Sequence, residues 1–334
     1  MENWRLNERA EQILREALAE GGERWRVRCH PAGAKVAGSV QPRHQASAGS
    51  GGQAWVVDAG VEAEGGIEAG LLLARVCLAD MAQVQLGLWG DGPWPGVIVH
   101  TDQPVVACLL SQYAGWQIQV GKFFAMGSGP MRAMYAREKL FEELGYRESA
   151  AVAVGVLECD KLPGEEVIAF LVEKLGVPAG GLRLLAAATA SLAGMIQVAA
   201  RSVETALHKL HELGYPLSEI VSGWGVAPLL PVAKGTLAAI GRSNDAVLYG
   251  ARVWLWVRSE DERLAEVGPR VPSCASSAFG RPFVEILKEA GGDFYRIDPM
   301  LFSPAEVHFC NLRSGRSFRF GQVRPDILLR SLEA

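Results

Sequence analysis

Apolar and polar side chains alternate in several short stretches of the chain, which is the spacing of strands with one buried face. The clearest case is residues 116–120, where tryptophan, isoleucine and valine alternate with two glutamines. Residues 306–312 and 316–320 flank a short turn and predict a hairpin. Apolar runs predict further strands at 55–57, 83–88, 96–101, 151–157, 182–189, 246–257 and 293–298.

Other stretches repeat apolar residues every three or four positions, which predicts helices. Asn7 is expected to cap the first helix, which Gly21 and Gly22 end. Pro130 suits the first position of a helix that should reach residue 144, directly after a turn at 127–129. Further helices are expected at 70–82, 165–175 and 194–215.

Strands and helices alternate through the middle of the chain, which predicts an α/β (α+β) fold. A length of 334 residues fits roughly two domains. We expect two lobes, at 1–150 and 151–334, with mixed sheets flanked by helices and a substrate cleft between them. This boundary is approximate, and the lobes can be discontinuous. Residues 33–54, rich in Gly, Ala and Ser, are expected to form a flexible loop or an insertion.

Composition narrows the class of protein. The net charge of −4 gives no basic field for nucleic acid. No apolar stretch reaches the ~20 residues of a membrane helix, and the first residues lack an apolar signal core. The six cysteines form no CxxC motif, which favours free thiols in a reducing compartment. A soluble cytoplasmic protein is therefore expected.

The predicted helix at 194–215 gathers polar side chains along one narrow arc. Arg201 and Glu204 are three residues apart, close enough to meet or to converge on one ligand. Gln197 and His208 share the arc. Two interpretations stay open on spacing alone: an ordinary solvated ion pair, or an arginine and a carboxylate that hold an anion and move a proton.

Several chemistries lack their sequence signatures. The six histidines show no HExxH spacing and do not pair with cysteines, so no metal site is predicted. There is no GxGxxG opening a βα unit, no GxxxxGK[ST] and no GxSxG elbow. Acid–base chemistry on an anionic small molecule, without a metal or redox cofactor, is the remaining expectation.

Six motifs, in order, resemble the methenyltetrahydromethanopterin cyclohydrolase family. They are GWQIQVGKFFAMGSGPMRA, TASLAGMIQVAARSVETALHKLHELGY, IVSGWGVAPLLPV, NDAVLYG, PSCASSAFGRPFVEI and DFYRIDPMLFSPAEV. The resemblance implies reversible hydrolysis of the methenyl bridge to the 5-formyl derivative in C1 metabolism. It also implies a homotrimer, no cofactor, and methenyltetrahydromethanopterin or its dephospho form as substrate. A non-catalytic pterin-binding protein and the same reaction on a folate analogue are the alternatives.

The resemblance assigns roles to residues of the polar arc. Glu204 matches the family's catalytic glutamate and is predicted to relay the proton. Arg201 matches the arginine one turn earlier and is predicted to orient Glu204 and the water. A guanidinium lowers the pKa of a neighbouring carboxyl whereas burial raises it, and the sequence does not decide between them. Gln197 is a candidate for a hydrogen bond to the pterin, and His208 stays unassigned.

Other substrate-binding candidates lie in turns. They are Gly127, Ser128, Gly129, Ser111, Gln112, Ser222, Gly223 and Asp298, and each has an alternative role in shaping its turn. Exposed amides at 127–129 would suit the acidic tail of the pterin. Ala275 and Phe279 stand where a threonine and a tyrosine are common in the family, which removes two hydroxyl contacts from that loop.

Overall fold

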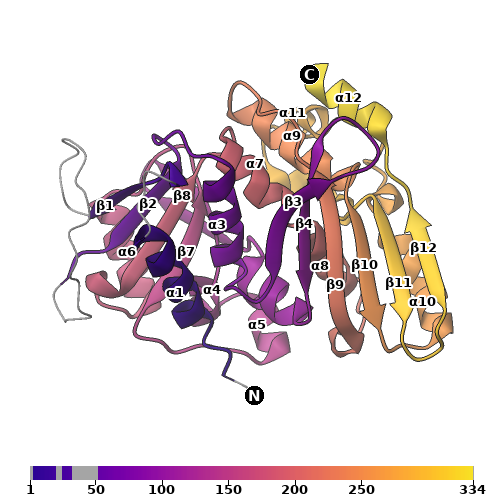
Figure 1. Ribbon diagram of the computed structural model, residues 1–334, viewed down its shortest axis with the longest axis horizontal. Coiled ribbons are helices and arrows are strands. Elements are labelled where there is room, and N and C mark those ends of the chain that lie inside the picture. The colour runs from indigo at the N-terminus through magenta and orange to yellow at the C-terminus, as the bar shows by residue number, and fades with distance from the viewer. Residues whose placement is uncertain (1–2, 20–24, 32–51, 334) are drawn as a thin grey trace. The chain divides into compact units, whose positions relative to one another are not determined.

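The computed structural model describes residues 3–19, 25–31 and 52–333. Most of the predicted loop or insertion at 33–54 lies outside the described residues. The chain divides into two compact units, residues 1–80 with 110–194 and residues 81–109 with 195–334. Each unit is discontinuous in sequence. Each contains a mixed six-stranded sheet flanked by helices, so the predicted α/β class is confirmed (Figure 1).

The sheet of the first unit has the order β1-β2-β8-β7-β6-β5. Strands β2, β8 and β7 run parallel to one another, and the outer pairs are antiparallel. The strands are β1 (Arg28–Pro31), β2 (Trp55–Gly60), β5 (Trp116–Val120), β6 (Phe123–Ser128), β7 (Ala153–Glu158) and β8 (Leu182–Ala187). The helices are α1 (Leu6–Ala19), α3 (Ile67–Cys77), α4 (Met131–Tyr135), α5 (Lys139–Leu144), α6 (Glu165–Leu175) and the 3₁₀ turn η2 (Ala179–Gly181).

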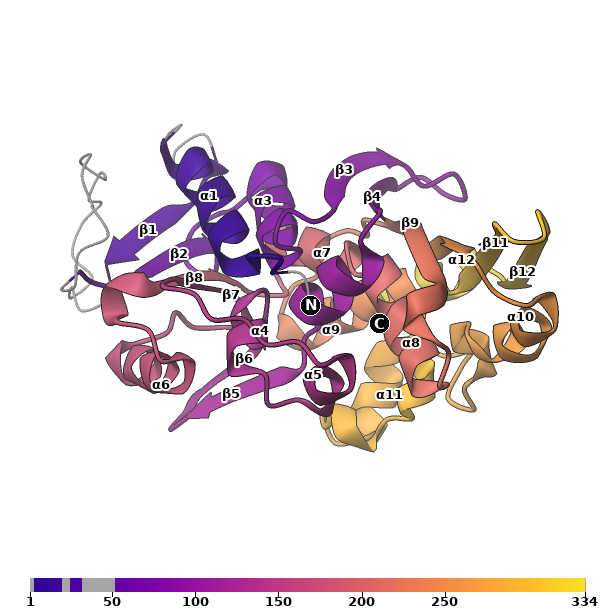
Figure 2. The same ribbon diagram turned by 90° about the horizontal axis from the view of Figure 1, so that it is seen from below.

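Helices cover both faces of the central strands of this sheet. Successive strand residues point to opposite faces, so each strand contributes side chains to two cores. Val57 and Leu185 belong to the core under α1 and α3. Val56 and Leu184 belong to the core under α4 and α6. Figure 2 shows α1 and α3 on one side of the strands and α6 on the other. The near-continuous apolar runs of β7 and β8 follow from this double burial.

The end of β2 is held by one buried carboxylate. Asp58 has no exposed surface. Its two oxygens accept the amides of Gly60, Val61, Glu62 and Ala63 at 3.1, 2.8, 3.0 and 2.7 Å. These four amide donors take the place of the water that burial removes from the carboxylate.

The sheet of the second unit has the order β12-β11-β10-β9-β4-β3. Only β10 and β11 are parallel. The strands are β3 (Gln83–Leu88), β4 (Pro95–Thr101), β9 (Ile220–Pro228), β10 (Arg252–Val257), β11 (Glu306–Asn311) and β12 (Ser317–Gly321). The α-helices are α8 (Ser202–Glu212), α9 (Thr236–Leu248), α10 (Asp261–Val267), α11 (Phe283–Glu289) and α12 (Pro325–Glu333). The 3₁₀ turns are η3 (Leu217–Glu219), η4 (Gly268–Arg270), η5 (Ser273–Ala275), η6 (Phe294–Arg296) and η7 (Pro299–Leu301).

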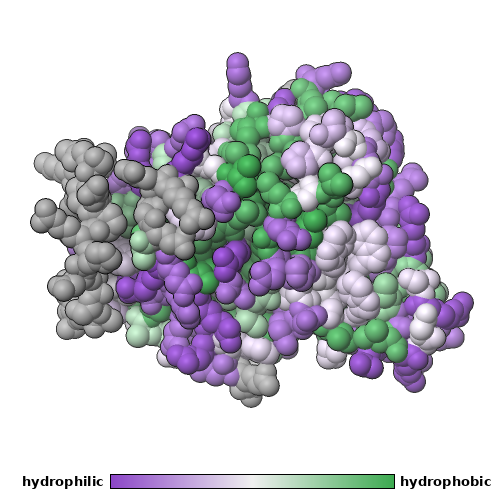
Figure 3. All heavy atoms as spheres, viewed as in Figure 1, coloured by the Kyte–Doolittle hydropathy of each residue, from purple (hydrophilic) through white to green (hydrophobic). Residues whose placement is uncertain are grey.

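The two faces of this sheet differ in character. Helix α8 packs against β9, β10 and β4 on one face. The other face carries half-buried aromatic side chains: Trp254 stacks on His308 at 4.3 Å and meets Trp224 edge-on at 5.1 Å. Residues of near-neutral hydropathy, which are pale in Figure 3, lie over part of these strands. Trp254 and Trp256 lie on one face of β10, whose residues alternate in burial.

The chain passes from one unit to the other within helical segments. The π-helix η1 (Val105–Gln112) contains the change from residue 109 to residue 110, and α7 (Leu192–Ala199) contains the change from 194 to 195. No described helix is long and apolar enough to cross a membrane.

Five sequence predictions need correction. Asn7 does not cap α1, because it lies inside the helix and its side chain bonds Pro130, Glu148 and Val154. The predicted strand at 246–257 is the end of α9 followed by β10, and 293–298 contains a 3₁₀ turn. The predicted helix 131–144 divides into α4 and α5, because Ala136 adopts a left-handed φ of 43°. Ser222 and Gly223, which were predicted to lie in a turn, lie within β9. The 306–320 hairpin is confirmed.

Candidate functional site

The stretch 194–215 is not one helix, as predicted, but two. Helix α7 ends at Ala199, and α8 begins at Ser202. Arg201 is the N-cap residue of α8, with φ −88° and ψ 7°. Gln197 therefore lies on a different helix from Glu204, and the polar arc is not a continuous helical face. Arg201 and Glu204 remain neighbours across the first turn of α8.

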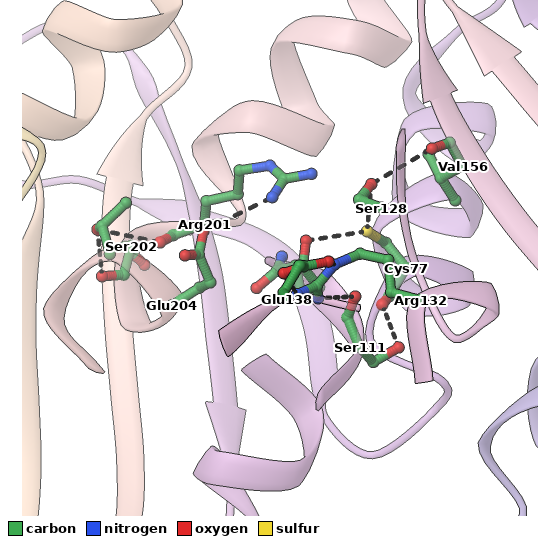
Figure 4. A network of polar contacts seen from close by, with 11 residues as sticks. Cys77, Ser111, Ser128, Arg132, Glu138, Val156, Arg201, Ser202 and Glu204 are labelled. Carbon is green, nitrogen blue, oxygen red and sulfur yellow. Dashed lines mark hydrogen bonds and ion pairs between the residues drawn. The ribbon is translucent and has the colours of Figure 1, made fainter. Parts of the chain in front are cut away.

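Arg201 and Glu204 are both buried, with 7% and 4% of their surfaces exposed. Arg201 Nη1 lies 3.6 Å from Glu204 Oε2 (Figure 4). This distance exceeds that of a normal hydrogen bond, so the contact is a charge interaction. An ordinary surface ion pair would keep both groups in water. Since desolvating two charges costs several kcal/mol per ion, their burial needs a reason beyond stability.

Gln197 and His208, the other members of the arc, differ in burial. Gln197 lies in α7 and is 3% exposed. The His208 side chain is 21% exposed, and its Nε2 lies 3.8 Å from Glu212 Oε1. His208 thus lies beside a surface carboxylate near the end of α8.

In the first unit, the structure brings the predicted residues Ser111, Gln112, Ser128 and Gly129 into one network around Cys77. Ser111 Oγ donates to the Cys77 carbonyl at 2.7 Å. The Cys77 thiol lies 3.2 Å from Ser128 Oγ and 3.7 Å from the Gln112 carbonyl (Figure 4). Ser111, Gln112 and Ser128 are all buried.

The predicted turn at 127–129 is largely strand. Gly127 and Ser128 end β6, and only Gly129 has a left-handed φ, of 86°. The Gly129 amide donates to the Ser111 carbonyl at 2.9 Å. Helix α4, which follows, has only five residues. The Gly129 amide is therefore engaged within the fold, and contacts from this segment to a ligand remain a prediction.

Arg132, which no sequence pattern singled out, is the most deeply buried charge of this network. Arg132 has no exposed surface and donates through Nε to Glu138 Oε1 at 2.9 Å and through Nη2 to Glu138 Oε2. Its Nη1 donates to the Ser111 carbonyl at 3.2 Å. The guanidinium also lies 5.0 Å from the ring of Tyr113. Nothing in the helical spacing marks Arg132 as buried, since it sits among residues that were assigned to one amphipathic helix.

The remaining predicted residues lie in the second unit. Ser222, in β9, donates its hydroxyl to Asp102 Oδ1 at 2.7 Å. Asp298 caps the 3₁₀ turn η7 by accepting the Met300 amide at 2.9 Å, and it accepts the Ser276 hydroxyl at 2.6 Å. These bonds give Ser222 and Asp298 structural roles, and their contacts to substrate stay predictions.

Lys209, which sequence analysis did not select, links α8 to the turn of Asp298. It is 1% exposed, and its ammonium donates to the Met300 carbonyl. Burial lowers the pKa of Lys209 to about 8, and the nearby Asp298 opposes this shift. A charge buried seven residues after Ser202 thus fixes the second half of the helix that carries Glu204.

Gly223 and Gly225 allow α8 to approach the sheet. A Cβ atom at Gly223 would lie 2.8 Å from Val203 Cγ1, and one at Gly225 would lie 2.5 Å from Ser202 Oγ. Gly223 was predicted as a substrate contact, whereas Gly225 was not selected. The alternation G-x-G within an apolar strand was the available signal for a close backbone approach.

Among the residues that the structure describes, no group of three or more His, Cys, Asp or Glu side chains is arranged to hold a metal ion. What the site offers chemically is a buried carboxylate with a guanidinium beside it, on a helix fixed at both ends. A carboxylate exchanges protons, and a neighbouring cation orients it and any water bound to it.

The sequence profile of a family described as Cyclohydrolase (MCH) matches residues 43–332. Three curated relatives carry the name methenyltetrahydromethanopterin cyclohydrolase. The protein from Rhodopirellula baltica is 49% identical over 283 residues, which cover 83% of this chain and 85% of the relative. The protein from Methylobacillus flagellatus is 46% identical, covering 83% and 86%. The protein from Methanosarcina barkeri is 44% identical, covering 83% and 88%.

Proposed function

The chain belongs to the methenyltetrahydromethanopterin cyclohydrolase family, and we propose that it hydrolyses 5,10-methenyltetrahydromethanopterin to the 5-formyl derivative, reversibly, in C1 metabolism. The observation that carries the proposal is the 49% identity to a relative of that name over 83% of the chain. The buried pair Arg201–Glu204 supplies groups that the reaction can use.

The substrate explains why a carboxylate suffices. The methenyl carbon lies between two nitrogens and shares a positive charge with them, so it is already electrophilic. Water can attack it once a base accepts a proton, without a Lewis acid. A carboxylate near the cation also favours binding through charge complementarity. The proposal therefore includes no cofactor.

Glu204 is the proposed proton relay. As the oxygen of water bonds to the methenyl carbon, Glu204 takes a proton from that water, which leaves a neutral carbinolamine. The bond from this carbon to one nitrogen then breaks, Glu204 returns its proton to that nitrogen, and the hydroxyl proton is released as the C=O bond of the formyl group forms. The sum is one cation plus water giving the formyl product and one proton. Arg201 is proposed to orient Glu204 and the water.

The remaining predicted residues complete the proposal. Gln197 is proposed to bind the pterin, with Ser111, Gln112, Gly127, Ser128, Gly129, Ser222, Gly223 and Asp298 as further contacts. A homotrimer is proposed from the family resemblance. The proposed cytoplasmic location is supported by the six cysteines, none of which forms a disulfide among the described residues.

The test is the loss of the methenyl-pterin absorbance on adding purified protein. We expect rapid loss with methenyltetrahydromethanopterin or its dephospho form, and formation of the 5-formyl product. Methenyltetrahydrofolate is assayed in parallel, and faster turnover of it would reassign the substrate to a folate. Tight binding of the pterin without turnover would instead show a non-catalytic pterin-binding protein.

A further inference from the structure

Strand β9 presents bare backbone to α8. Gly223 and Gly225 alternate with Ser222 and Trp224 along the strand, so both glycines face the helix. The nearest side chains are those of Ser202 and Val203, in the first turn of α8.

Neither glycine is required by its own backbone conformation. Gly223 and Gly225 are not among the residues with positive φ, so an alanine could adopt the same conformation. Glycine inside a strand also weakens the strand, because it has no side chain to pack and loses more entropy on folding. The reason for these glycines is therefore the space that they leave for α8.

The space is smallest at Gly225. A Cβ atom there would lie 2.5 Å from Ser202 Oγ, 3.0 Å from Val203 Cγ2 and 3.3 Å from Ser202 Cβ. Ordinary contacts begin at 3.4 Å, so the hydroxyl would have to move by about 0.9 Å (3.4 − 2.5). Ser202 is fully buried, which limits where its side chain can turn.

We propose that Gly225, assisted by Gly223, is a positioning residue that sets the distance between the sheet and the first turn of α8. The inference rests on the proposed function, because its consequence concerns Glu204. Arg201, Ser202, Val203 and Glu204 are consecutive, so a displaced Ser202 displaces both charged neighbours (Figure 4). The C-terminal half of α8 is restrained from moving with its first turn, because Lys209 donates a hydrogen bond to the Met300 carbonyl.

The expected effect is on turnover. Misplacement by ~1 Å costs up to 10²-fold in rate when the reacting groups must be aligned. Gly225→Ala should therefore lower kcat by roughly 10- to 100-fold, with a smaller change in KM. A purely structural role would lower the melting temperature and leave the kcat of the folded protein unchanged.

Ser202→Ala provides a selective rescue. The Ser202 hydroxyl has no hydrogen-bond partner among the described residues, so its removal breaks no such bond and should leave kcat near the wild-type value. It also removes the atom closest to the added methyl group. We expect the Gly225→Ala/Ser202→Ala double variant to recover most of the lost kcat, which a general destabilisation would not do.

Gly164→Ala is the matched control, because Gly164 has a φ of −85° and no atom within 4 Å of its Cβ position. It should retain wild-type kcat. If Gly225→Ala does not fold, Gly223→Ala with and without Val203→Ala makes the same comparison at a milder contact of 2.8 Å.

The outcomes separate the two proposals. A wild-type protein that does not turn over the methenyl pterin contradicts the function itself. An active wild type with undiminished kcat in Gly225→Ala, or a folded double variant that shows no recovery, overturns the positioning role. A crystal structure of Gly225→Ala gives a readout without activity: the first turn of α8 should be displaced from β9, and an unmoved turn would contradict the proposal.

Discussion

Two arginine–carboxylate pairs with buried guanidinium groups, one in each unit, use the same groups in different ways; Glu204 is buried as well, whereas the Glu138 side chain is 17% exposed. Arg132 holds Glu138 through two nitrogens, Nε at 2.9 Å and Nη2, and uses a third nitrogen on the Ser111 carbonyl. Arg201 approaches Glu204 at 3.6 Å, at the break between two helices. The first arrangement is a bidentate hydrogen-bonded pair, and the second is a charge contact between near neighbours.

The difference indicates different purposes. A bidentate pair orients both groups and satisfies several donors, which suits a structural contact that holds chain segments together. Glu138 and Ser111 lie 27 residues apart (138 − 111), and Arg132 ties them together. A carboxylate that must exchange protons gains nothing from being locked in this way. Burial alone therefore does not identify the pair proposed for the proton relay, whereas the 3.6 Å separation of Arg201 and Glu204 at a helix start fits that proposal.

The largest expected effect is on catalysis at the second pair. Glu204→Gln keeps the shape of the side chain and removes its ability to take a proton, so kcat should fall by ~10²–10⁴-fold. The fold and the melting temperature should change little. The measurement is the absorbance assay together with a thermal melt. Glu212→Gln, at a 51% exposed side chain on the same helix, is the control and should remain active. Near-normal turnover by Glu204→Gln would remove this residue from the proton relay.

The next effect is on stability at the first pair. Arg132→Met leaves Glu138 without its partner, and removing one member of a buried pair costs ~3–5 kcal/mol. The double variant Arg132→Met/Glu138→Leu should lose less, because it leaves no uncompensated charge. Urea unfolding of both variants measures the difference. A double variant as unstable as Arg132→Met would mean that Arg132 stabilises the fold through packing and its contact with Ser111, and not through its charge interaction with Glu138.

A third buried carboxyl, Asp245, extends the comparison to a group without an arginine in ion-pair distance among the described residues. Oδ1 accepts the Phe283 amide at 2.8 Å, and Oδ2 has no described hydrogen-bond partner. Burial raises the pKa of Asp245 to about 7 from 3.8; the nearby Ser331 hydroxyl and the Phe283 amide oppose this rise, and Glu285 and Arg330 have smaller, opposite effects.

The sign of its pH dependence follows from this raised pKa. Between about pH 4 and 7 the folded protein holds a proton that the unfolded chain has lost, so the stability due to Asp245 falls as pH rises through that window. Asp245→Asn cannot ionise, and it should melt at a higher temperature than the wild type at pH 8, with the gap shrinking towards pH 5. Thermal melts at both pH values test this, and a gap independent of pH would contradict it.

The smallest effect is expected at an exposed pair with good geometry. Arg281 donates to both oxygens of Glu289, at 2.6 and 2.9 Å. Both side chains are largely exposed, at 43% and 63%, so water and salt screen the attraction. Arg281→Ala should change the melting temperature far less than Arg132→Met, and high salt should erase what remains. A loss as large as that of Arg132→Met would show that geometry outweighs burial.

The strands were the most predictable part of the fold. Residues 116–120 and 83–88 were located from their patterns with the bounds that the structure has, because a strand with one buried face imposes a period of two. Residues 246–248 were misassigned as strand because they are buried residues at the end of α9. A short run of apolar residues is typical both of a buried helix and of a buried strand, so it does not distinguish the two.

The candidate site was predictable only in part. Helical spacing and the family resemblance predicted Glu204 and Arg201 as site residues. Neither predicted the break between α7 and α8 at Arg201. Periodicity describes one element at a time, whereas α8 begins where Ser202 and Val203 pack against the glycines of β9. Arg132 was missed for the same reason, since its partners Glu138 and Ser111 lie on other segments.

The loop after β2 has a consequence for amide hydrogen exchange. It has no regular secondary structure after Gly60, so its amides would ordinarily exchange with solvent deuterium within the time of local fluctuations. Here four consecutive amides, from Gly60 to Ala63, donate to the buried Asp58 carboxylate. Exchange at any of them requires the carboxylate to release its donors. This irregular loop should therefore be as slow to exchange as the strands beside it, and Asp58→Asn should make it fast.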